Sequence, residues 1–461
     1  MATQNTNLIN DSAAKPSLQD KTFFVKTFGC QMNSADSEQM SSLLAEAGAK
    51  AAPDALSADI VILNGCEVRE KAVHKALSSL GVIQKHVRST GQKKVIGIGG
   101  CVGSLKGKNL FTRNPHLDFV FGTDNIAQLP ELVHRVQSGE RHVVFNQFDK
   151  SDNYDIETKV FTKSASAFVN IMKGCDKFCS YCIVPFTRGR EKSRPIADIV
   201  ADIQRLALHG VCEVTLLGQN VNSFGKGYDE TFPQLLRAVD AISGIKRIRF
   251  TSSHPIDFSD ELIECYGELK SLAPHLHLPV QSGSNPVLQK MHRHYKIETY
   301  YEQIAKWRRH CPEGGLTTDM IVGFPTETDE DFAMTMKLIE DMKYDMVYAF
   351  AYSPRPGTKA EKLVDNVPDE VKHDRLLKLQ ERVVQISNEQ NQRWVDREVE
   401  VLIEGPVKAL ANATHTKMWQ GRAPTNHVVN FPYDGDHDLS GRLLPIRIVR
   451  ATGLALTGEL T

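Results

Sequence analysis

The sequence predicts an α/β protein with three folded parts: an amino-terminal domain around a parallel sheet, an open barrel of six β/α units, and a small carboxy-terminal antiparallel β-barrel. Two observations predict this fold class. In residues 22–147 and 167–368, short apolar runs alternate with helical patterns, as in parallel strands joined by crossover helices. From about Trp394 onward the helical patterns stop and short β segments succeed one another, which is typical of a small barrel.

The composition limits the class of protein. The net charge over 461 residues is −1, so no overall basic field attracts nucleic acid. No run of eighteen apolar residues is present, which argues against a membrane span. Met1–Asp20 is polar and lacks the apolar segment of a secretory signal. Nine cysteines without such a signal favour reduced thiols, metal sites and a cytoplasmic location. We expect a disordered tail at 1–20, the amino-terminal domain at 21–147, a polar linker at 148–166, the open barrel at 167–393 and the small β-barrel at 394–461.

The amino-terminal domain repeats one local pattern three times, in which a strand is followed by glycine and cysteine. The expected strands are Phe23–Thr27, Asp59–Leu63 and Val95–Ile98, and the cysteines that follow them are Cys30, Cys66 and Cys101, here called the amino-terminal triad. Helical patterns follow at Ser37–Ala47, with Gly48 as the residue after the C-cap, and at Val68–His86. Because parallel strands end at one edge of a sheet, we expect the three thiols to converge there. The alternative is three small residues buried in a core.

The barrel region shows six short apolar runs separated by helical patterns. Six units are too few for a closed eight-fold barrel and fit an open one with right-handed crossovers. A helical stretch at Asp369–Asn391 ends the barrel, and three β segments follow at Glu398–Ile403, His427–Phe431 and Leu443–Val449. The expected barrel strands are Phe168–Met172, Glu213–Leu217, Arg247–Thr251, His275–Leu278, Thr317–Ile321 and Met346–Ala351.

Three cysteines within eight residues directly follow the first barrel strand. They are Cys175, Cys179 and Cys182, here called the barrel triad. Thiolates favour iron–sulfur clusters or zinc, and three of them can hold three irons of a four-iron cubane, leaving the fourth iron open to a small molecule. A zinc knuckle and a disulfide loop are the alternatives; zinc usually takes four ligands, and no fourth Cys or His follows nearby. Cys212, Cys265 and Cys311 have no partners at ligand spacing, and we interpret them as structural.

The spacing C-x-x-x-C-x-aromatic-C, with Tyr181 at the aromatic position, resembles the radical S-adenosylmethionine (SAM) enzymes. The run Ile183–Arg194, together with Thr27–Asn33 and Asp36-Ser37-Glu38, resembles their methylthiotransferase branch, over about Thr22 to Glu459. The resemblance implies one 4Fe-4S cluster on each triad, with SAM bound at the barrel cluster. The chain departs from the family at Gly65 and Glu67, where Thr and Ser are usual, and at Val102-Gly103-Ser104.

Polar residues lie at the ends of the barrel strands, where ligands of such folds bind. By resemblance we assign Tyr181, Gln219, Gln281, Ser282 and Asp319 to the SAM pocket. The alternative for each is a turn or helix-cap residue.

The resemblance also implies an activity. Position 2 of adenine has neither an acidic proton nor a leaving group, so radical chemistry carried by cofactors suits it better than acid–base catalysis. The family uses an electron from the barrel cluster to cleave SAM to a 5′-deoxyadenosyl radical, and methylated sulfur from the second cluster. Gln31-Met32-Asn33 resembles the branch that acts on N6-isopentenyladenosine next to the tRNA anticodon, whereas the ribosomal-protein branch typically has Pro-Lys-Asn there. The alternatives are action on threonylcarbamoyl-adenosine or on a ribosomal-protein aspartate, and a non-catalytic iron–sulfur RNA-binding protein.

The expected partners are tRNA, an electron donor such as flavodoxin or ferredoxin, and a sulfur source. Residues 173–194 carry six basic side chains against two acids, a local charge of +4, and the runs His292-Arg293-His294 and Arg308-Arg309-His310 add more. The carboxy-terminal barrel resembles the TRAM domain of RNA-modifying enzymes through Val401–Pro406, although it has seven basic residues against eight acids. The expected RNA contacts are Arg188, Arg190, Arg194, Lys417, Trp419 and Arg422.

Overall fold

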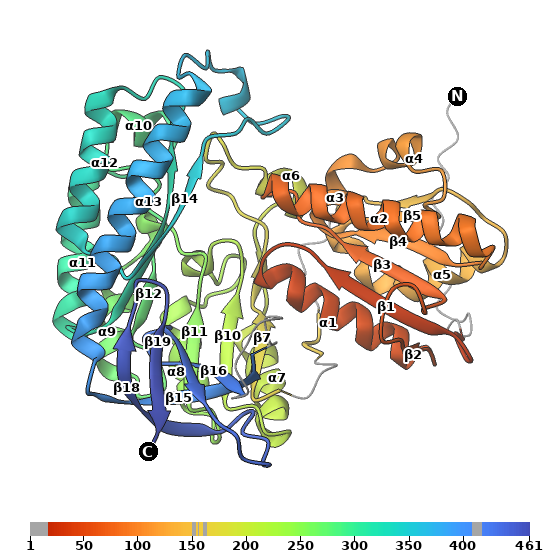
Figure 1. The fold of residues 1–461 in the computed structure, drawn as a ribbon. Coiled ribbons are helices and arrows are strands. Elements are labelled where there is room, and N and C mark those ends of the chain that lie inside the picture. Colours follow the sequence, from red (N-terminus) through yellow and green to blue (C-terminus); the bar gives the residue numbers. More distant parts are fainter. Residues whose placement is uncertain (1–16, 150–153, 155, 160–163, 408–416) are drawn as a thin grey trace. The chain divides into compact units, whose positions relative to one another are not determined.

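The computed structural model describes residues 17–149, 154, 156–159, 164–407 and 417–461 (Figure 1). The chain divides into two compact units, and the division lies within residues 150–162, inside the expected linker. Most of the tail expected at 1–20 lies outside the described residues. Leu18 is only 1% exposed, and its amide bonds to Ala47 O at 2.7 Å, so the ordered structure begins earlier than expected. The other domain boundaries stay predictions.

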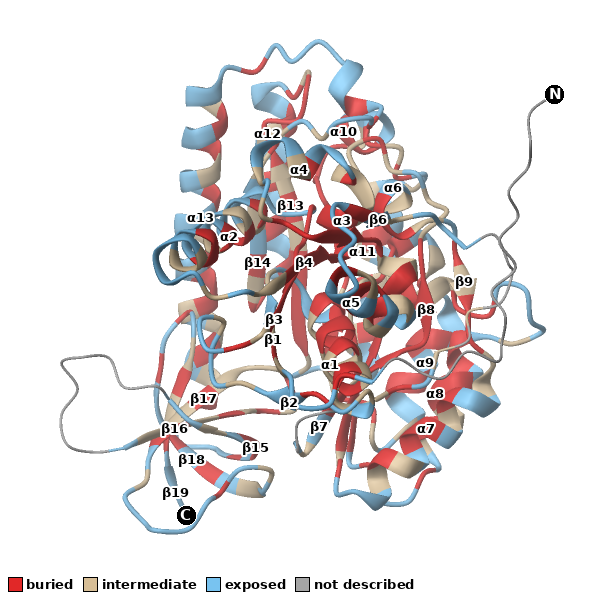
Figure 2. Cartoon of the chain, turned by 90° about the vertical axis from the view of Figure 1, so that its right-hand side faces the viewer, coloured by how far each residue is buried: buried red, intermediate tan, exposed pale blue. Residues whose placement is uncertain are grey.

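The first unit is a parallel six-stranded sheet between helices, with strand order β2-β1-β3-β4-β5-β6. Strand β3 is buried throughout, as the burial colours of Figure 2 show. Its alternate residues enter two different cores. Ile60 and Ile62 pack with residues of α1 and α5, whereas Val61 and Leu63 pack with residues of α2. The elements of this unit are β1 Thr22–Thr27, α1 Gln31–Glu46, β2 Lys50–Ala51, β3 Ile60–Asn64, α2 Glu70–Thr90, β4 Val95–Gly99, α3 Gly100–Lys106, α4 Asn109–Arg113, β5 Phe119–Phe121, η1 Thr123–Gln128, α5 Leu129–Gln137 and β6 Val143–Phe145.

The three expected strands of this unit are present as β1, β3 and β4. Gly48 has a φ of +100° just after the C-cap of α1, as its position after the helical pattern predicted. The sequence did not predict α3, nor that α1 begins directly after Cys30. These two helix starts put two of the triad's cysteines at or within a first helical turn.

The second unit contains the expected six parallel strands. They form two three-stranded sheets, β11-β10-β7 and β12-β13-β14, and a parallel bridge from Ile248 to Leu272 joins the two. Helices follow the strands in sequence, and the barrel elements are β7 Ser166–Asn170, β8 Met172–Lys173, α6 Val184–Arg188, β9 Lys192–Ser193, α7 Ile196–Leu208, β10 Glu213–Leu217, η2 Val221–Ser223, α8 Phe232–Asp240, β11 Arg247–Phe250, η3 Pro255–Asp257, α9 Asp260–Glu268, β12 His275–His277, α10 Asn285–Lys290, α11 Ile297–His310, β13 Gly315–Val322, α12 Asp329–Met342, β14 Met346–Ala351, η4 Ala360–Lys362, α13 Asp369–Asn391 and η5 Gln392–Trp394.

The carboxy-terminal region is a closed barrel of five strands in the order β15-β16-β17-β19-β18. The three β segments expected from the sequence are present as β15, β17 and β18, whereas β16 and β19 were not predicted. The pairing is antiparallel except between β17 and β19, which are parallel. Its strands are β15 Glu398–Pro406, β16 Met418–Arg422, β17 Val428–Pro432, β18 Leu443–Ala451 and β19 Leu456–Leu460.

This small barrel packs on the amino-terminal ends of the β/α strands. Arg247 and Arg249, from β11, pair with Glu213 at 3.3 and 3.0 Å and donate to the carbonyls of Arg422, Ala423 and Pro424. Polar residues expected to bind SAM lie at the opposite, carboxyl ends of the strands. Because the eight-residue strand β13 alone spans about 26 Å, the small barrel lies far from that end. No helix in the part of the chain that the structure describes is long and apolar enough to cross a membrane.

Candidate functional site

The three Gly-Cys turns of the amino-terminal triad meet at the carboxyl edge of the first sheet. The neighbouring Cys30 thiol, then burial and the nearby Cys101, raise the pKa of Cys66, so the three thiols lie close together. A Cβ added at Gly29, whose φ is +135°, would lie 2.4 Å from the Cβ of Cys66. Glycine is therefore required at this turn, because any side chain would separate the cysteines.

A buried amide pair fastens the same turns together. Asn33 and Asn64 are both fully buried, and Asn33 Nδ2 donates to Asn64 Oδ1 at 3.0 Å. Asn64 Nδ2 donates in return to Asn33 O at 2.8 Å and to Ser37 Oγ at 3.0 Å. The Cys30 thiol donates to Asn33 Oδ1 at 3.4 Å. The network fixes the position of Cys30 relative to β3, and the sequence did not identify it.

The chain's departures from the family fit this packing. A Cβ added at Gly65 would lie 2.8 Å from Val102 Cγ2, and one at Gly103 would lie 2.0 Å from Phe121 O. Glu67 is buried and pairs with Lys106 Nζ at 3.1 Å. These substitutions leave the three thiols together.

The loop that carries the barrel triad is anchored on both sides. Ser180 donates its amide to Met291 O at 3.0 Å and its hydroxyl to Lys290 O at 2.8 Å, at the end of α10. On the other side Gly174, with φ +73°, donates its amide to the Gln219 side chain. A Cβ there would lie 2.0 Å from Arg190 O, so only glycine fits.

Three ion pairs complete the anchoring. Lys177 Nζ lies 2.7 Å from Asp257 Oδ1, and Asn220 donates to the other carboxylate oxygen at 2.7 Å. Burial alone would raise the pKa of Asp176, but hydrogen bonds from Arg190 and Lys226 outweigh it and lower the pKa to about 2. Asp176 therefore stays ionised at neutral pH and holds the loop by charge.

The three cysteines of the barrel triad are partly buried. Burial raises the pKa of Cys175 to about 11 and that of Cys182 to about 12. The neighbouring Cys179 adds to the rise in pKa at both Cys175 and Cys182, so the three thiols lie close together. Such thiols lose their protons when a metal binds them.

Cys179 has two polar neighbours that the sequence did not identify. Arg293 NH1 donates to Cys179 Sγ at 3.5 Å, and His254 Nε2 lies 4.0 Å from the same sulfur. Burial, followed by the charges of Arg293, Lys177 and His294, lowers the pKa of His254 to about 2. Arg293 belongs to a run that the sequence marked as basic, but the run did not reveal what its residues contact.

The residues fit an iron–sulfur cluster. All nine cysteines are described and are free thiols, so the disulfide loop does not form here. Among the described residues no group of three or more His, Cys, Asp or Glu is placed to hold a single metal ion. A four-iron cubane does not need three side chains around a single ion, because each thiolate binds a separate iron. Arg293 is 4% exposed and its Nε has no hydrogen-bond partner within the described structure. A buried cation beside three thiols suits an anionic group.

The expected SAM residues occupy the ends of the strands but differ in exposure. Gln219 is half-buried and its Oε1 accepts the amide of Gly174. Gln281 has a φ of +76° and bonds through its backbone to β13. Asp319 is half-buried, with Oδ2 at 3.8 Å from His277 Nε2. Tyr181 packs against the apolar cluster around Met291 and Phe324.

Ser282 is fully buried and its hydroxyl lies 3.4 Å from Thr335 Oγ1 on α12. The contact of Ser282 with SAM stays a prediction, and the contact that the structure shows for its hydroxyl is the one to helix α12. Ser282 therefore ties the loop after β12 to the helix.

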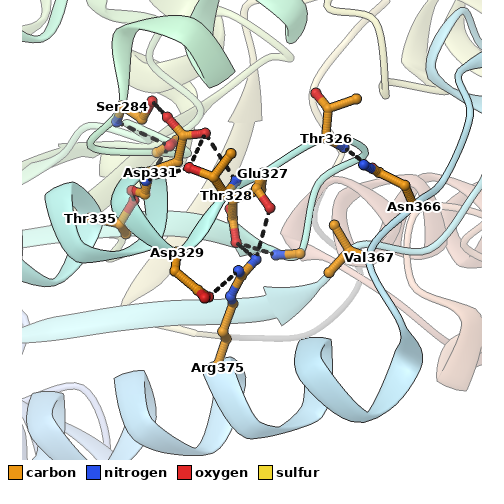
Figure 3. A network of polar contacts seen from close by, with 12 residues as sticks. Ser284, Thr326, Glu327, Thr328, Asp329, Asp331, Thr335, Asn366, Val367 and Arg375 are labelled. Atoms are coloured by element: carbon orange, nitrogen blue, oxygen red, sulfur yellow. Dashed lines mark hydrogen bonds and ion pairs between the residues drawn. The ribbon is translucent and has the colours of Figure 1, made fainter.

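The same loops are locked by the network in Figure 3. Arg375, from α13, reaches Glu327 Oε1 at 2.8 Å and Asp329 at 2.7 Å, and Glu327 accepts the Gly323 amide at 2.8 Å. Asp331 accepts hydrogen bonds from Ser284 and from Thr328. One helix thus fixes the turn after β13.

Several expected RNA contacts are buried. Arg188 is 5% exposed, and Arg194 is 3% exposed with NH2 at 2.8 Å from Asp202 Oδ2. Trp419 packs in the core of the small barrel against Tyr433. Local charge and aromaticity did not reveal that the fold buries these side chains, and their contact with RNA stays a prediction.

The remaining expected RNA contacts are more accessible. Arg190 is exposed but pairs with Asp176 at 2.6 Å, and Arg422 pairs with Glu404 at 2.9 Å. Lys417 is exposed at the start of β16. Lys417 is therefore the candidate whose side chain is least engaged in the described structure.

This chain is similar in sequence to two known families and to named bacterial proteins. Residues 22–122 match the family described as "Uncharacterized protein family UPF0004", and residues 169–339 match the radical SAM superfamily. The tRNA-2-methylthio-N(6)-dimethylallyladenosine synthase of Myxococcus xanthus is 46% identical over 447 residues, covering 95% of this chain and 94% of that protein. The protein of the same name from Geotalea uraniireducens is 44% identical over 445 residues, covering 96% of this chain and 99% of that protein.

Solved structures show the fold. The radical S-adenosylmethionine methyltransferase TsrM from Kitasatospora setae, with tryptophan and a SAM analogue bound, aligns with a TM-score of 0.55 at 14% identity, covering 74% of this chain and 75% of that chain. On near full-length identity above 40%, the chain belongs to the family of tRNA-2-methylthio-N(6)-dimethylallyladenosine synthases, which are radical SAM methylthiotransferases.

Proposed function

We propose that this protein attaches a methylthio group to position 2 of N6-isopentenyladenosine next to the anticodon of tRNA. The observation that carries the proposal is the 46% identity over 95% of the chain to a synthase of that name. The two cysteine triads support it, because the cofactors of this family are SAM and two 4Fe-4S clusters.

In this proposal each triad holds one cluster. The clusters and SAM supply the electron, the radical and the sulfur when bound. The chain's own residues position these groups. Asp176 and Lys177 hold the loop of the barrel triad through ion pairs to neighbouring strand ends, and Asn33 and Asn64 hold the turns of the amino-terminal triad.

The SAM pocket lies at the carboxyl ends of the barrel strands in this proposal. Gln219, Gln281 and Asp319 face it, and Tyr181 packs beneath the cluster loop. Ser282 acts through the loop that it fastens to α12, since its hydroxyl lies beside Thr335. The half-exposed Asp319 carboxylate suits directed hydrogen bonds to a cofactor with hydroxyl and amino groups.

The adenine and its prenyl group are received, we infer, by an aromatic surface on β14. Tyr348 and Phe350 are 43% and 40% exposed, whereas the alternate residue Val347 is buried towards α13. In the sheet register Tyr348 pairs with Asp319 and Phe350 with Ile321, so the aromatic rings share a face with the expected SAM pocket. Exposed rings beside a cofactor site suit a flat base with an apolar substituent.

The choice of N6-isopentenyladenosine as substrate rests on the sequence identity to the named synthases more than on the local signature Gln31-Met32-Asn33. Met32 is 5% exposed and Asn33 is fully buried, so within Gln31-Met32-Asn33 only Gln31 is exposed. Met32 and Asn33 therefore influence the choice of substrate indirectly, through their packing around the amino-terminal triad. Lys417 and Arg190 are the proposed RNA contacts, and a cytoplasmic location, a flavodoxin or ferredoxin as electron donor and a separate sulfur source complete the proposal.

The test uses anticodon stem-loop RNA with and without the isopentenyl group. Anaerobically reconstituted protein with SAM and a reductant should add a methylthio group, seen by mass spectrometry, to the prenylated loop. The unprenylated loop should bind more weakly, since about 0.8 kcal/mol is lost per methylene-sized group that is no longer buried. Equal turnover of the two loops, or turnover only on threonylcarbamoyl-adenosine or a ribosomal-protein peptide, would assign the chain to a sister branch.

The aromatic surface has its own test. Tyr348→Ala and Phe350→Ala should each weaken binding of the prenylated loop by about 5- to 100-fold, in line with about 1–3 kcal/mol per stacked base. Tyr228→Ala, at an exposed tyrosine in a different loop, is the matched control and should leave binding unchanged. Wild-type affinity in both β14 variants would remove these rings from the substrate site.

A further inference from the structure

The sulfur of Cys179 accepts polar contacts from two elements that are distant in sequence. Arg293 follows α10 and donates through NH1 to Cys179 Sγ at 3.5 Å, 114 residues along the chain. Its NH2 donates to Pro279 O at 2.6 Å, which fixes the plane of the guanidinium. Its guanidinium carbon Cζ also lies over the Tyr295 ring, 5.5 Å from the ring centroid. The guanidinium is therefore held against the sulfur by the fold.

No carboxylate among the described residues forms an ion pair with Arg293, although its side chain is nearly inaccessible to water. A buried cation is stable only with a compensating charge or strong acceptors. Arg293 NH1 donates instead to the sulfur of Cys179, which can carry negative charge as a thiolate. The charge of Arg293 is thus directed at the group that the barrel triad holds.

The second contact comes from His254, after β11. Its Nδ1 accepts the backbone amide of Ile256 at 3.2 Å, and an amide can only donate. The Nδ1 atom therefore carries no proton, and the ring proton lies on Nε2, which faces Cys179 Sγ at 4.0 Å. This distance is the outer limit of a hydrogen bond to sulfur, so His254 supplies the weaker of the two contacts.

We propose that Arg293 and His254 raise the reduction potential of the cluster held by Cys175, Cys179 and Cys182, and so act as positioning residues for its electron transfer. The reduced cluster carries one more negative charge, part of which lies on the cysteine sulfurs. A nearby guanidinium and an N–H donor stabilise that charge, as hydrogen bonds to cluster sulfurs do in general. The inference rests on the proposed function only in assigning a cluster to this triad, and it is independent of the RNA substrate.

The test measures potential rather than turnover. The full-length chain with Cys30, Cys66 and Cys101 replaced by Ala, which should leave the barrel cluster alone, is titrated with reductant and followed by electron paramagnetic resonance. At the potential where the parent cluster is half reduced, Arg293→Met should lower the ratio of reduced to oxidised cluster about tenfold, which is about 59 mV for one electron. Arg293→Lys should recover most of the ratio, because it keeps the charge.

Two further variants separate this role from a structural one. His254→Asn keeps an acceptor for the Ile256 amide but withdraws the donor from Cys179, and it should lower the ratio about threefold with iron content unchanged. Arg309→Met removes an exposed positive charge from α11 and should leave the ratio unchanged. A ratio in Arg293→Met equal to that in Arg309→Met overturns the proposal.

If Arg293→Met does not load iron, His254→Asn decides, and an unchanged ratio there overturns the proposal. A control titration uses the chain with both triads intact and follows the paramagnetic resonance signal that changes when SAM is added. It checks that the cysteine replacements do not themselves cause the shift in potential. A protein that shows the expected shifts but modifies no prenylated RNA would refute the proposed function and leave this inference standing.

Discussion

Replacing Arg375 with Met should strongly destabilise the second unit, because it leaves a buried carboxylate without its partner. The side chains of Arg375 and Glu327 are 7% and 1% exposed and lie 2.8 Å apart (Figure 3). At an effective dielectric constant of 20 their attraction is about 6 kcal/mol. Desolvation offsets part of this, and breaking such a pair typically costs about 3–5 kcal/mol. The contact to Asp329 adds little, because that carboxylate is 92% exposed.

The assay is urea unfolding followed by tryptophan fluorescence. All three tryptophans, Trp307, Trp394 and Trp419, belong to the second unit, so the signal reports that unit alone. With a denaturant slope of about 3 kcal/mol per molar, the midpoint should fall by about 1 M or more. The urea midpoints of the variants are compared at the same denaturant slope. This is needed because the second unit contains two barrels, and such a unit does not have to unfold in a single step.

The matched control lies on the same helix. Arg382 forms a bidentate pair with Glu340, and both side chains are partly exposed, at 31% and 45%. Arg382→Met should cost less than about 1 kcal/mol. The double change Arg375→Met with Glu327→Gln should recover part of the loss, because the amide still accepts the Gly323 hydrogen bond without a buried charge. Equal midpoints for Arg375→Met and Arg382→Met would refute the reasoning.

The loss should also depend on pH. Burial raises the pKa of Glu327 above its ordinary 4.5, although Arg375 acts in the opposite direction. A carboxyl with a raised folded pKa favours folding most below its unfolded pKa, and this contribution is lost as the pH rises through the folded value. Without Arg375 the folded pKa rises further, so the carboxyl can protonate in the folded state. The destabilisation should therefore be smaller near pH 5 than near pH 8.

Three other predictions concern the two triads. Reconstituted protein should hold about eight irons, and replacing the barrel triad with alanine should leave about four, so a variant that keeps all its iron contradicts that assignment. Replacing the amino-terminal triad should preserve reductive SAM cleavage, read as 5′-deoxyadenosine, and abolish sulfur transfer; thiomethylated RNA from it would exclude that triad as the sulfur donor. Gly174→Ala should lose most of the barrel cluster's iron, because the added Cβ would lie 2.0 Å from Arg190 O. Gly227→Ala is the control and should keep full iron content, because the space around Gly227 is open. Equal iron content in the two variants would show that the turn at Gly174 tolerates the change.

The sequence alone was enough to predict the strands that carry the chemistry. Apolar runs of four to eight residues followed by glycine and polar residues are local signals, and they located β1, β3, β4 and all six barrel strands. Because the ends of parallel strands share one edge, the same pattern predicted that Cys30, Cys66 and Cys101 come together. The spacing within Cys175–Cys182 is likewise a local property, since one loop carries all three thiols.

Only the tertiary structure decided which polar side chains reach that chemistry. Arg194 and Arg293 look alike in the sequence, as basic residues in basic runs, yet one pairs with Asp202 and the other contacts Cys179. Trp419 looked like an RNA contact and lies in a core. The contact between Arg293 and Cys179 joins residues 114 positions apart, and no periodicity within one segment encodes that meeting. The sequence therefore determined which cysteines come together, and the packing of the loops after α10 and β11 determined which polar side chains contact Cys179.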